Sequence, residues 1–135
     1  MSPLFQKGEE KAAREAAAFA ELERMRALAP DELALEVLPA LGPDGPRGSR
    51  FVRVQDICKW LMRSHRVGLK ASPMQLLAVV REALQRLEHA DLVWSMQSDG
   101  PSLWKLTRLG EQALSGGTAA QHLGPLGASA RSAQA

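Results

Sequence analysis

Two short apolar segments on either side of a tight turn constrain the fold of this chain more than any other feature. They cover residues 92–96 and 102–106, and the turn between them contains Ser-Asp-Gly-Pro. Because Gly and Pro favour a chain reversal between strands, this pattern predicts a β-hairpin. We expect Trp94 and Trp104 to face each other across the hairpin as a stacked pair. Both rings fall at packing positions, which favours a core role at the base of the hairpin over a base-stacking platform.

Helical periodicity dominates the segments around the hairpin. A first short helix should begin at Pro30 and end at the Gly- and Pro-rich turn of residues 42–46. Apolar residues at helical spacing mark two further helices, with the expected buried faces Val54, Ile57, Cys58 and Leu61, and then Leu76, Val80, Ala83, Leu84 and Leu87. The latter helix should begin at the Ser72-Pro73 cap, with Gln75 in a capping box, and run to about Ala90. The expected fold class is mainly α with a small β-hairpin.

Composition divides the chain into three zones. Residues 1–29 are rich in alanine and charge, which predicts a helix that serves as an arm or as a dimerisation element. The apolar stripe of this helix is thin and consists of Ala12, Ala16, Phe19, Leu22 and Met25. Residues 30–115 form the expected folded domain, whereas residues 116–135 lack periodicity and bulk, which predicts a flexible tail.

Composition also excludes several classes of protein. A single cysteine among 135 residues rules out a disulfide framework and a cysteine-based zinc site. Cys58 lies on an apolar stripe, and His65, His89 and His122 fall on separate elements. We therefore expect no enzyme activity, no metal and no cofactor. No apolar run approaches the roughly 20 residues of a membrane helix and no secretion signal is evident, so we expect a cytoplasmic protein without membrane contact.

Two segments that flank the hairpin match a known pattern. Residues 87–93 read Leu-Glu-His-Ala-Asp-Leu-Val, and residues 106–114 read Leu-Thr-Arg-Leu-Gly-Glu-Gln-Ala-Leu. With the order helix, strand, helix, helix, hairpin, helix, they resemble the winged helix-turn-helix domain of MarR- and PadR-type bacterial transcription regulators over about residues 30–115. Those families carry Leu-Glu-x-x-Gly-Leu-Val and Leu-Thr-x-x-Gly-x-x-x-Leu. Asp91 replaces the first Gly, and the left-handed turn stays accessible because Asp enters that region more readily than most residues.

The resemblance implies a winged helix-turn-helix with an extra N-terminal helix that binds duplex DNA. In such domains the start of the third helix enters the major groove, which implies base contacts by Ser72, Met74, Gln75 and Ala78. Gln75 is the best candidate base reader, because Gln can pair bidentately with adenine. The expected wing tip, residues 97–100, has one acid and no cation. The resemblance also implies a homodimer on paired half-sites, for which the N-terminal helix is a candidate contact.

The net charge of +2 conceals an uneven distribution of charge. Residues 47–72 contain seven Lys and Arg and one acid, Asp56, whereas residues 31–46 contain four acids and no cation. In a winged helix the basic segment lies beside the phosphate backbone, where such a cluster would form an electrostatic footprint. The expected phosphate contacts are Arg50, Arg53, Lys59, Arg63, Arg66, Lys70 and Lys105. The sequence therefore predicts a DNA-binding transcription regulator.

A second interpretation stays open at the level of sequence. A run of charge is often only a solvated face, and winged-helix domains also bind proteins. The neutral start of the third helix, with Met74, Leu77 and Val79, and the acidic wing tip would suit a protein-protein interaction module. Such a module could be an accessory subunit of a transcription or DNA-handling complex, with a protein partner and no sequence-specific DNA binding.

Overall fold

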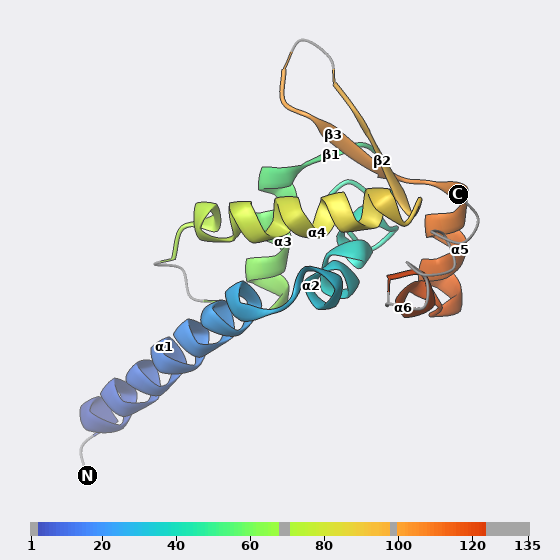
Figure 1. Ribbon diagram of the computed structural model, residues 1–135. Helices are drawn as coiled ribbons and strands as arrows, with labels where there is room; N and C mark the ends of the chain where they lie inside the picture. Colours follow the sequence, from blue (N-terminus) through green and yellow to red (C-terminus); the bar gives the residue numbers. More distant parts are fainter. Residues whose placement is uncertain (1–2, 68–70, 98–99, 124–135) are drawn as a thin grey trace.

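The computed structural model describes residues 3–67, 71–97 and 100–123, and it is mostly helical with one small antiparallel sheet (Figure 1). The helices are α1 (Pro3–Ala27), α2 (Pro30–Val37), α3 (Val54–Ser64), α4 (Leu77–His89), α5 (Arg108–Gly116) and α6 (Ala119–Leu123). Two 3-10 segments, η1 (Leu38–Leu41) and η2 (Pro73–Leu76), follow α2 and precede α4. The strands are β1 (Val52–Arg53), β2 (Val93–Met96) and β3 (Leu103–Leu106). The predicted class, mainly α with a β-hairpin, is confirmed.

The helix α4 lies at the centre of the domain, packed against α2 and α3. An ion pair of 2.6 Å between Arg86 and Asp31 joins α4 to α2. The residues predicted to form the inner face of this helical segment are all buried: Leu76, Val80, Ala83, Leu84 and Leu87. The expected buried face of α3 is also confirmed, namely Val54, Ile57, Cys58 and Leu61. Apolar periodicity therefore predicted correctly which sides of α3 and α4 meet in the core.

The start of this central segment differs from the predicted capping box. Residues 73–76 form the 3-10 segment η2, and the α-helix itself begins at Leu77. The hydroxyl of Ser72 accepts a hydrogen bond from the backbone N–H of Met74 at 3.2 Å. The N–H of Gln75 instead donates to the carbonyl of Ser72 at 3.0 Å, a bond of the 3-10 type. Because that bond uses the Gln75 N–H, the predicted capping box does not form.

The three strands are arranged in the order β1-β3-β2, with both neighbouring pairs antiparallel. In the hairpin, Trp94 pairs with Lys105 and Trp104 pairs with Ser95. Successive side chains of a strand point to opposite faces, so the two indoles lie on opposite sides of the sheet. The predicted Trp94–Trp104 stack is therefore wrong, by a register difference of one residue. Trp104 packs against the core as expected, whereas Trp94 is 43% exposed.

The left-handed turn expected at Asp91 is confirmed, with φ of 62°. The N–H of Leu92 donates to the carbonyl of Leu87, and the N–H of Asp91 donates to the carbonyl of Glu88, both at 3.0 Å. This pair of bonds is a Schellman motif, which satisfies the last carbonyls of a helix. Leu87 and Leu92 are both fully buried, which supplies the apolar contact that accompanies the motif. The turn thereby directs the chain from α4 into β2.

The second matched segment packs directly on this turn. The hydroxyl of Thr107 donates to the carbonyl of Asp91 at 2.5 Å and accepts from the N–H of Gly110 at 2.9 Å, so it caps α5. Gly110 lies so close to Leu92 that an added Cβ would be 1.9 Å from the Leu92 carbonyl oxygen. One contact between the end of α4 and the start of α5 thus explains why Thr107 and Gly110 occupy their positions in this segment.

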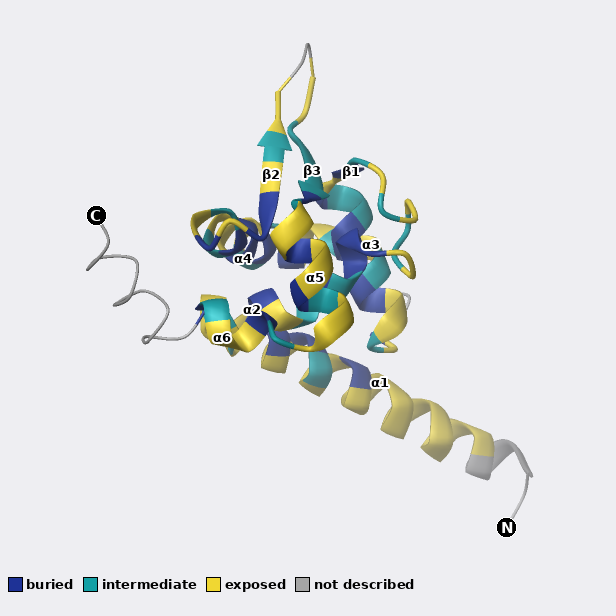
Figure 2. Ribbon diagram, turned by 90° about the vertical axis from the view of Figure 1, so that its right-hand side faces the viewer, coloured by how far each residue is buried: buried dark blue, intermediate teal, exposed yellow. Residues whose placement is uncertain are grey.

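The long helix α1 packs on the domain only near its C-terminal end, and the rest of it projects outward (Figures 1 and 2). Leu22 and Met25 are buried, whereas Ala12, Ala16 and Phe19 are exposed. The predicted stripe is therefore split, because Ala18 and not Phe19 faces the domain in that turn, and the helix extends beyond the domain toward its N-terminus. Sequence periodicity gave neither the side of α1 that meets the domain nor the length over which it does so.

Polar contacts fix the packed end of α1. The guanidinium of Arg24 donates to Glu21 in the same helix and to Glu36 of α2, the latter at 2.8 Å. The Nδ1 atom of His65, just after α3, lies 3.0 Å from the carboxylate of Glu21. The hydrogen bond from Arg24 lowers the pKa of Glu21 from its ordinary value. These contacts tie α1 to α2 and to the end of α3.

The segment after α5 differs from the predicted tail. Residues 119–123 form α6, and Leu123 is 2% exposed where α6 packs against α2. Composition missed this element because a single buried leucine in a segment of Gly, Ala and Ser has no periodicity to detect. The rest of the predicted tail, residues 124–135, lies outside the described residues.

Candidate nucleic-acid interface

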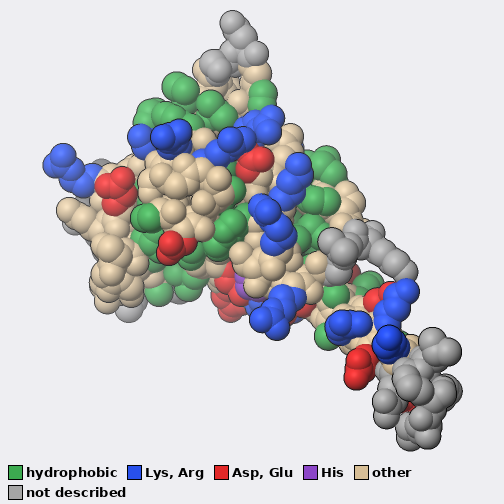
Figure 3. Space-filling model, turned by 180° about the vertical axis from the view of Figure 1, so that it is seen from behind, with side chains coloured by type: hydrophobic (Ala, Val, Ile, Leu, Met, Phe, Trp, Pro, Cys, Tyr) green, Lys and Arg blue, Asp and Glu red, His purple; other side chains and the backbone are tan. Residues whose placement is uncertain are grey.

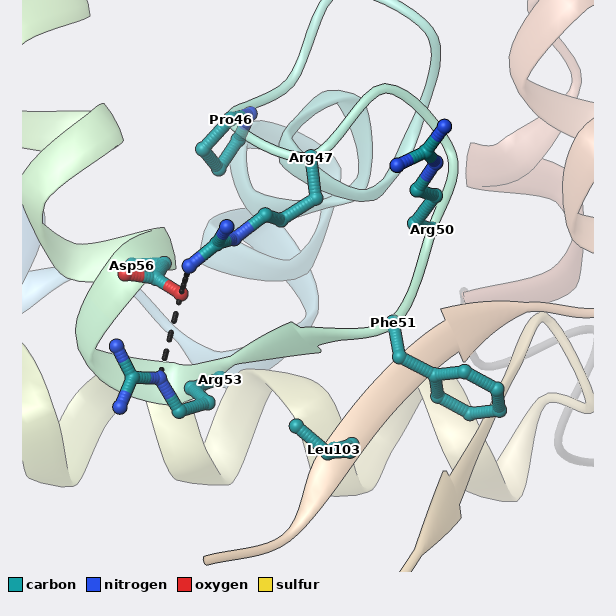
Figure 4. Close-up of a pocket in the computed structure, with 7 residues that line it drawn as sticks. All are labelled: Pro46, Arg47, Arg50, Phe51, Arg53, Asp56 and Leu103. Atoms are coloured by element: carbon teal, nitrogen blue, oxygen red, sulfur yellow. Dashed lines mark hydrogen bonds and ion pairs between the residues drawn. The ribbon is translucent and has the colours of Figure 1, made fainter.

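Three arginines line a pocket of about 430 Å³ at the edge of the sheet (Figure 4). Arg47 and Arg53 point toward Asp56 from two sides, with N–O distances of 3.4 and 3.5 Å. Arg50 points away from that carboxylate and lies near Phe51 (Figure 4). With three guanidinium groups and one carboxylate, the pocket is net positive. We name these three residues the arginine triad.

The loop before β1 places Arg47 and Arg50 of the arginine triad, and Arg53 lies on β1 itself. Gly48 and Ser49 both have positive φ, of 55° and 70°, and the N–H of Ser49 donates to the carbonyl of Gly42 at 3.1 Å. The indole N–H of Trp60 on α3 donates to the carbonyl of Asp44 at 3.3 Å. These bonds hold the loop against α3, so its arginines project beside the start of that helix. The Gly- and Pro-rich residues 42–46 predicted only a chain reversal. In the structure this turn also positions Arg47 and Arg50.

A second cationic groove, of about 830 Å³, lies between α1 and the end of α3. Lys11 and Arg14 line it from α1, and Arg63 and Arg66 line it from the α3 side. The acidic side chains in its lining are Glu15 and Glu21. Sequence reasoning missed the contribution of α1, because residues 1–29 contain equal numbers of cations and acids and their sum hides which face each one occupies.

The predicted phosphate contacts largely share one side of the molecule. Figure 3 shows Lys and Arg side chains spread over the face that carries α3 and continuing onto α1. The expected contacts Arg50, Arg53, Lys59, Arg63 and Arg66 are all exposed and lie on α3 or on the segments that flank it. Lys105 lies on β3, with its Nζ 5.4 Å from the centre of the Phe51 ring. Lys70 lies outside the described residues, as do Ser98 and Asp99 of the hairpin tip.

The expected base contacts lie on η2 and the start of α4. Met74, Gln75 and Ala78 are exposed, and Ser72 is exposed but its hydroxyl is used for the cap of η2. Glu82 and Gln85 continue the exposed side of α4. Figure 2 shows α4 and α3 on opposite sides of the domain, with their buried faces toward each other. The structure thus separates the outer face of α4 from the cationic face of α3.

Three further observations concern the thiol, metal ligands and membrane spans in the described part of the chain. Burial raises the pKa of the Cys58 thiol to about 11, so the thiol stays protonated and unreactive near neutral pH. Among residues 3–67, 71–97 and 100–123, no three His, Cys, Asp or Glu side chains gather as a metal site. In the same residues, no helix has both the length and the apolar character needed to cross a bilayer.

Comparison with known proteins gives no match: no family model, no curated protein and no solved structure is significantly similar to the chain. The fold and the cationic face therefore carry the functional argument alone. What they define is a small, mostly helical domain with a three-stranded antiparallel sheet and a positively charged side.

Proposed function

We propose that this chain is a winged-helix protein that binds duplex DNA and acts as a transcription regulator. The order of helices, the β1-β3-β2 sheet and the packing of the Asp91 turn on Gly110 support the resemblance to MarR- and PadR-type domains. In the proposal β2 and β3 form the wing, and the duplex lies against the cationic face of α3. Because the outer face of α4 points away from that face, the base contacts expected on η2 and α4 are not part of the proposed interface. Fold alone does not define function, so the proposal depends on the surface.

The cationic face of α3 carries this proposal. Six described cations in residues 47–67 stand against one acid: Arg47, Arg50, Arg53, Lys59, Arg63 and Arg66 against Asp56. Five of them line two grooves of a size that admits phosphate groups, namely Arg47, Arg50 and Arg53 in one and Arg63 and Arg66 in the other. Guanidinium groups suit phosphate because their planar donors bind its oxygens in pairs.

Salt dependence of duplex binding tests this function. If six cations neutralise phosphates, the logarithm of the affinity should fall with the logarithm of salt concentration at a slope of about −5. Fluorescence anisotropy with a labelled 20-base-pair duplex between 50 and 200 mM salt would measure it. The double change Arg50→Ala and Arg63→Ala should make the slope less steep by about 2. Arg26→Ala is the matched control, because Arg26 is exposed, pairs with Glu23 and lines neither groove.

Two results would reject the proposal. One is no duplex binding at 50 mM salt, and the other is a slope near zero. Equal effects of the double change and of Arg26→Ala would show that net charge alone, and not this face, attracts DNA. A protein-protein interaction module would then be the better interpretation, with the exposed Met74 as a candidate contact.

We also propose that the free part of α1 pairs with a second chain, as the family resemblance implies. Ala12, Ala16 and Phe19 lie on the side of α1 that the domain leaves exposed, and Phe19 is 65% exposed. Light scattering should give twice the chain mass of 14.6 kDa. Phe19→Asp should return the protein to a monomer, whereas a monomeric parent protein would exclude this contact.

A further inference from the structure

The sheet of this protein has one face in the core and one in solvent. Val93, Leu106 and Val52 are buried on the inner face. The register places Trp94 opposite Lys105 on the other face. By the same alternation, Met96, Leu103 and Arg53 lie on this outer face, where Met96 pairs with Leu103 and Leu103 pairs with Arg53.

Exposed aromatic surface is the first unusual property of the outer face. Trp94 is 43% exposed and Met96 is 38% exposed. The rings of Phe51 and Trp94 meet edge to face, with centroids 4.9 Å apart and an interplanar angle of 78°. The ammonium of Lys105 lies over the Phe51 ring at 5.4 Å. Phe51 is thus engaged on two sides, and Trp94 presents the accessible ring surface.

Cations border the aromatic surface, which is its second unusual property. Phe51 and Leu103 line the same pocket as the arginine triad (Figure 4). The arginine triad shares its pocket with Phe51, and Lys105 lies over the Phe51 ring, so four cations border this face, with Asp56 as the acid of the pocket. An occupant of this face should therefore combine flat apolar rings with regularly spaced negative charge.

We propose that the outer face of the sheet binds an unpaired stretch of nucleic acid, with a base stacked on Trp94 and the adjacent phosphates at the arginine triad and Lys105. Single strands expose the flat faces of their bases, whereas a duplex buries them in its own stack. Aromatic platforms beside a cationic groove bind single strands with little sequence preference, because every base has such a face. The inference rests on the cationic surface of the proposed function and adds a separate site for bases.

Two oligonucleotides of equal charge test this site. The probes are a labelled 12-nucleotide poly-dT and an abasic strand of the same length, which keeps the phosphates and lacks the bases. Loss of one stacked base typically weakens binding roughly 5- to 150-fold. We expect Trp94→Ala to weaken poly-dT within that range and to leave the abasic strand unchanged, and we expect Trp94→Phe to recover part of the loss. Leu109→Ala is the control, because Leu109 is an exposed apolar side chain on α5 that lines neither cationic groove.

The outcomes separate this inference from the proposed function. Equal affinity for poly-dT and the abasic strand would overturn the stacking site, and a steep salt slope on duplex would still uphold duplex binding. Trp94-dependent binding of poly-dT without duplex binding would uphold the site and reject the duplex function. A 12-residue polyglutamate that displaces poly-dT as well as unlabelled poly-dT does would overturn the inference in favour of an acidic peptide. Circular dichroism of Trp94→Ala checks that the variant folds.

Discussion

Arg66 occupies a backbone position that favours glycine. At the end of α3 its φ is 56°, its N–H donates to the carbonyl of Arg63, and the N–H of Val67 donates to the carbonyl of Met62 at 2.8 Å. This is the same Schellman motif that ends α4, where the left-handed residue is most often Gly. A side chain with a Cβ is strained there, so Arg66 reduces stability while it supplies a cation to the groove beside α1.

The change Arg66→Gly should therefore raise stability and weaken DNA binding at once. Relief of the left-handed strain is worth about 1 kcal/mol, which raises the melting temperature by about 3–5 °C in a chain of this size. The Arg66 side chain is exposed, so its removal leaves no cavity. Loss of one phosphate contact should make the salt slope less steep by about 0.9. Thermal unfolding by circular dichroism and anisotropy titrations of the duplex measure the two effects.

Two variants separate strain from charge. Asp91→Gly relieves the same geometry at the end of α4, where φ is 62°. The gain in stability from Asp91→Gly should be smaller than that from Arg66→Gly, because Asp tolerates the left-handed region better than Arg. This change removes a negative charge, so it takes no cation away from the DNA-binding surface. Arg66→Ala keeps the strain and loses the cation, so it should weaken binding without a rise in melting temperature. The reasoning is refuted if Arg66→Gly lowers the melting temperature, or if it changes DNA binding no more than Asp91→Gly does.

Two further predictions concern the core. Gly110→Ala should lower the free energy of unfolding, measured in urea, by about 2 kcal/mol, because its Cβ would meet the Leu92 carbonyl oxygen at 1.9 Å. Gly116→Ala in the same helix is the control and should be neutral or stabilising, because the nearest atom to its Cβ is 3.9 Å away. Equal effects of the two changes would contradict the contact between Gly110 and Leu92. The buried Cys58 should not react with a thiol reagent at pH 8 until urea unfolds the protein. Because its pKa rises from 9.0 to about 11 on folding, the unfolded thiol ionises first and stability should fall between these pH values, less so in Cys58→Ala.

Local sequence patterns predicted the features that depend on neighbours along the chain. The buried faces of α3 and α4, the left-handed turn at Asp91 and the cap of α5 by Thr107 each follow from residues within a few positions of one another. The hairpin followed from its turn, but the register did not. A shift of one residue moves every side chain to the other face, and so Trp94 is on the outer face instead of opposite Trp104.

The sequence by itself determined the helices from α1 to α5, the hairpin and the presence of a basic segment, because propensity, periodicity and charge are properties of short stretches of chain. Only the tertiary structure decided which cations share a face. It brought Lys11 and Arg14 of α1 beside Arg63 and Arg66, and it placed the exposed side of α4 away from them. It also joined Phe51, far from the hairpin in sequence, to the exposed ring of Trp94. Such surfaces depend on packing between distant segments, since burial of each apolar face fixes where the opposite, charged face must point.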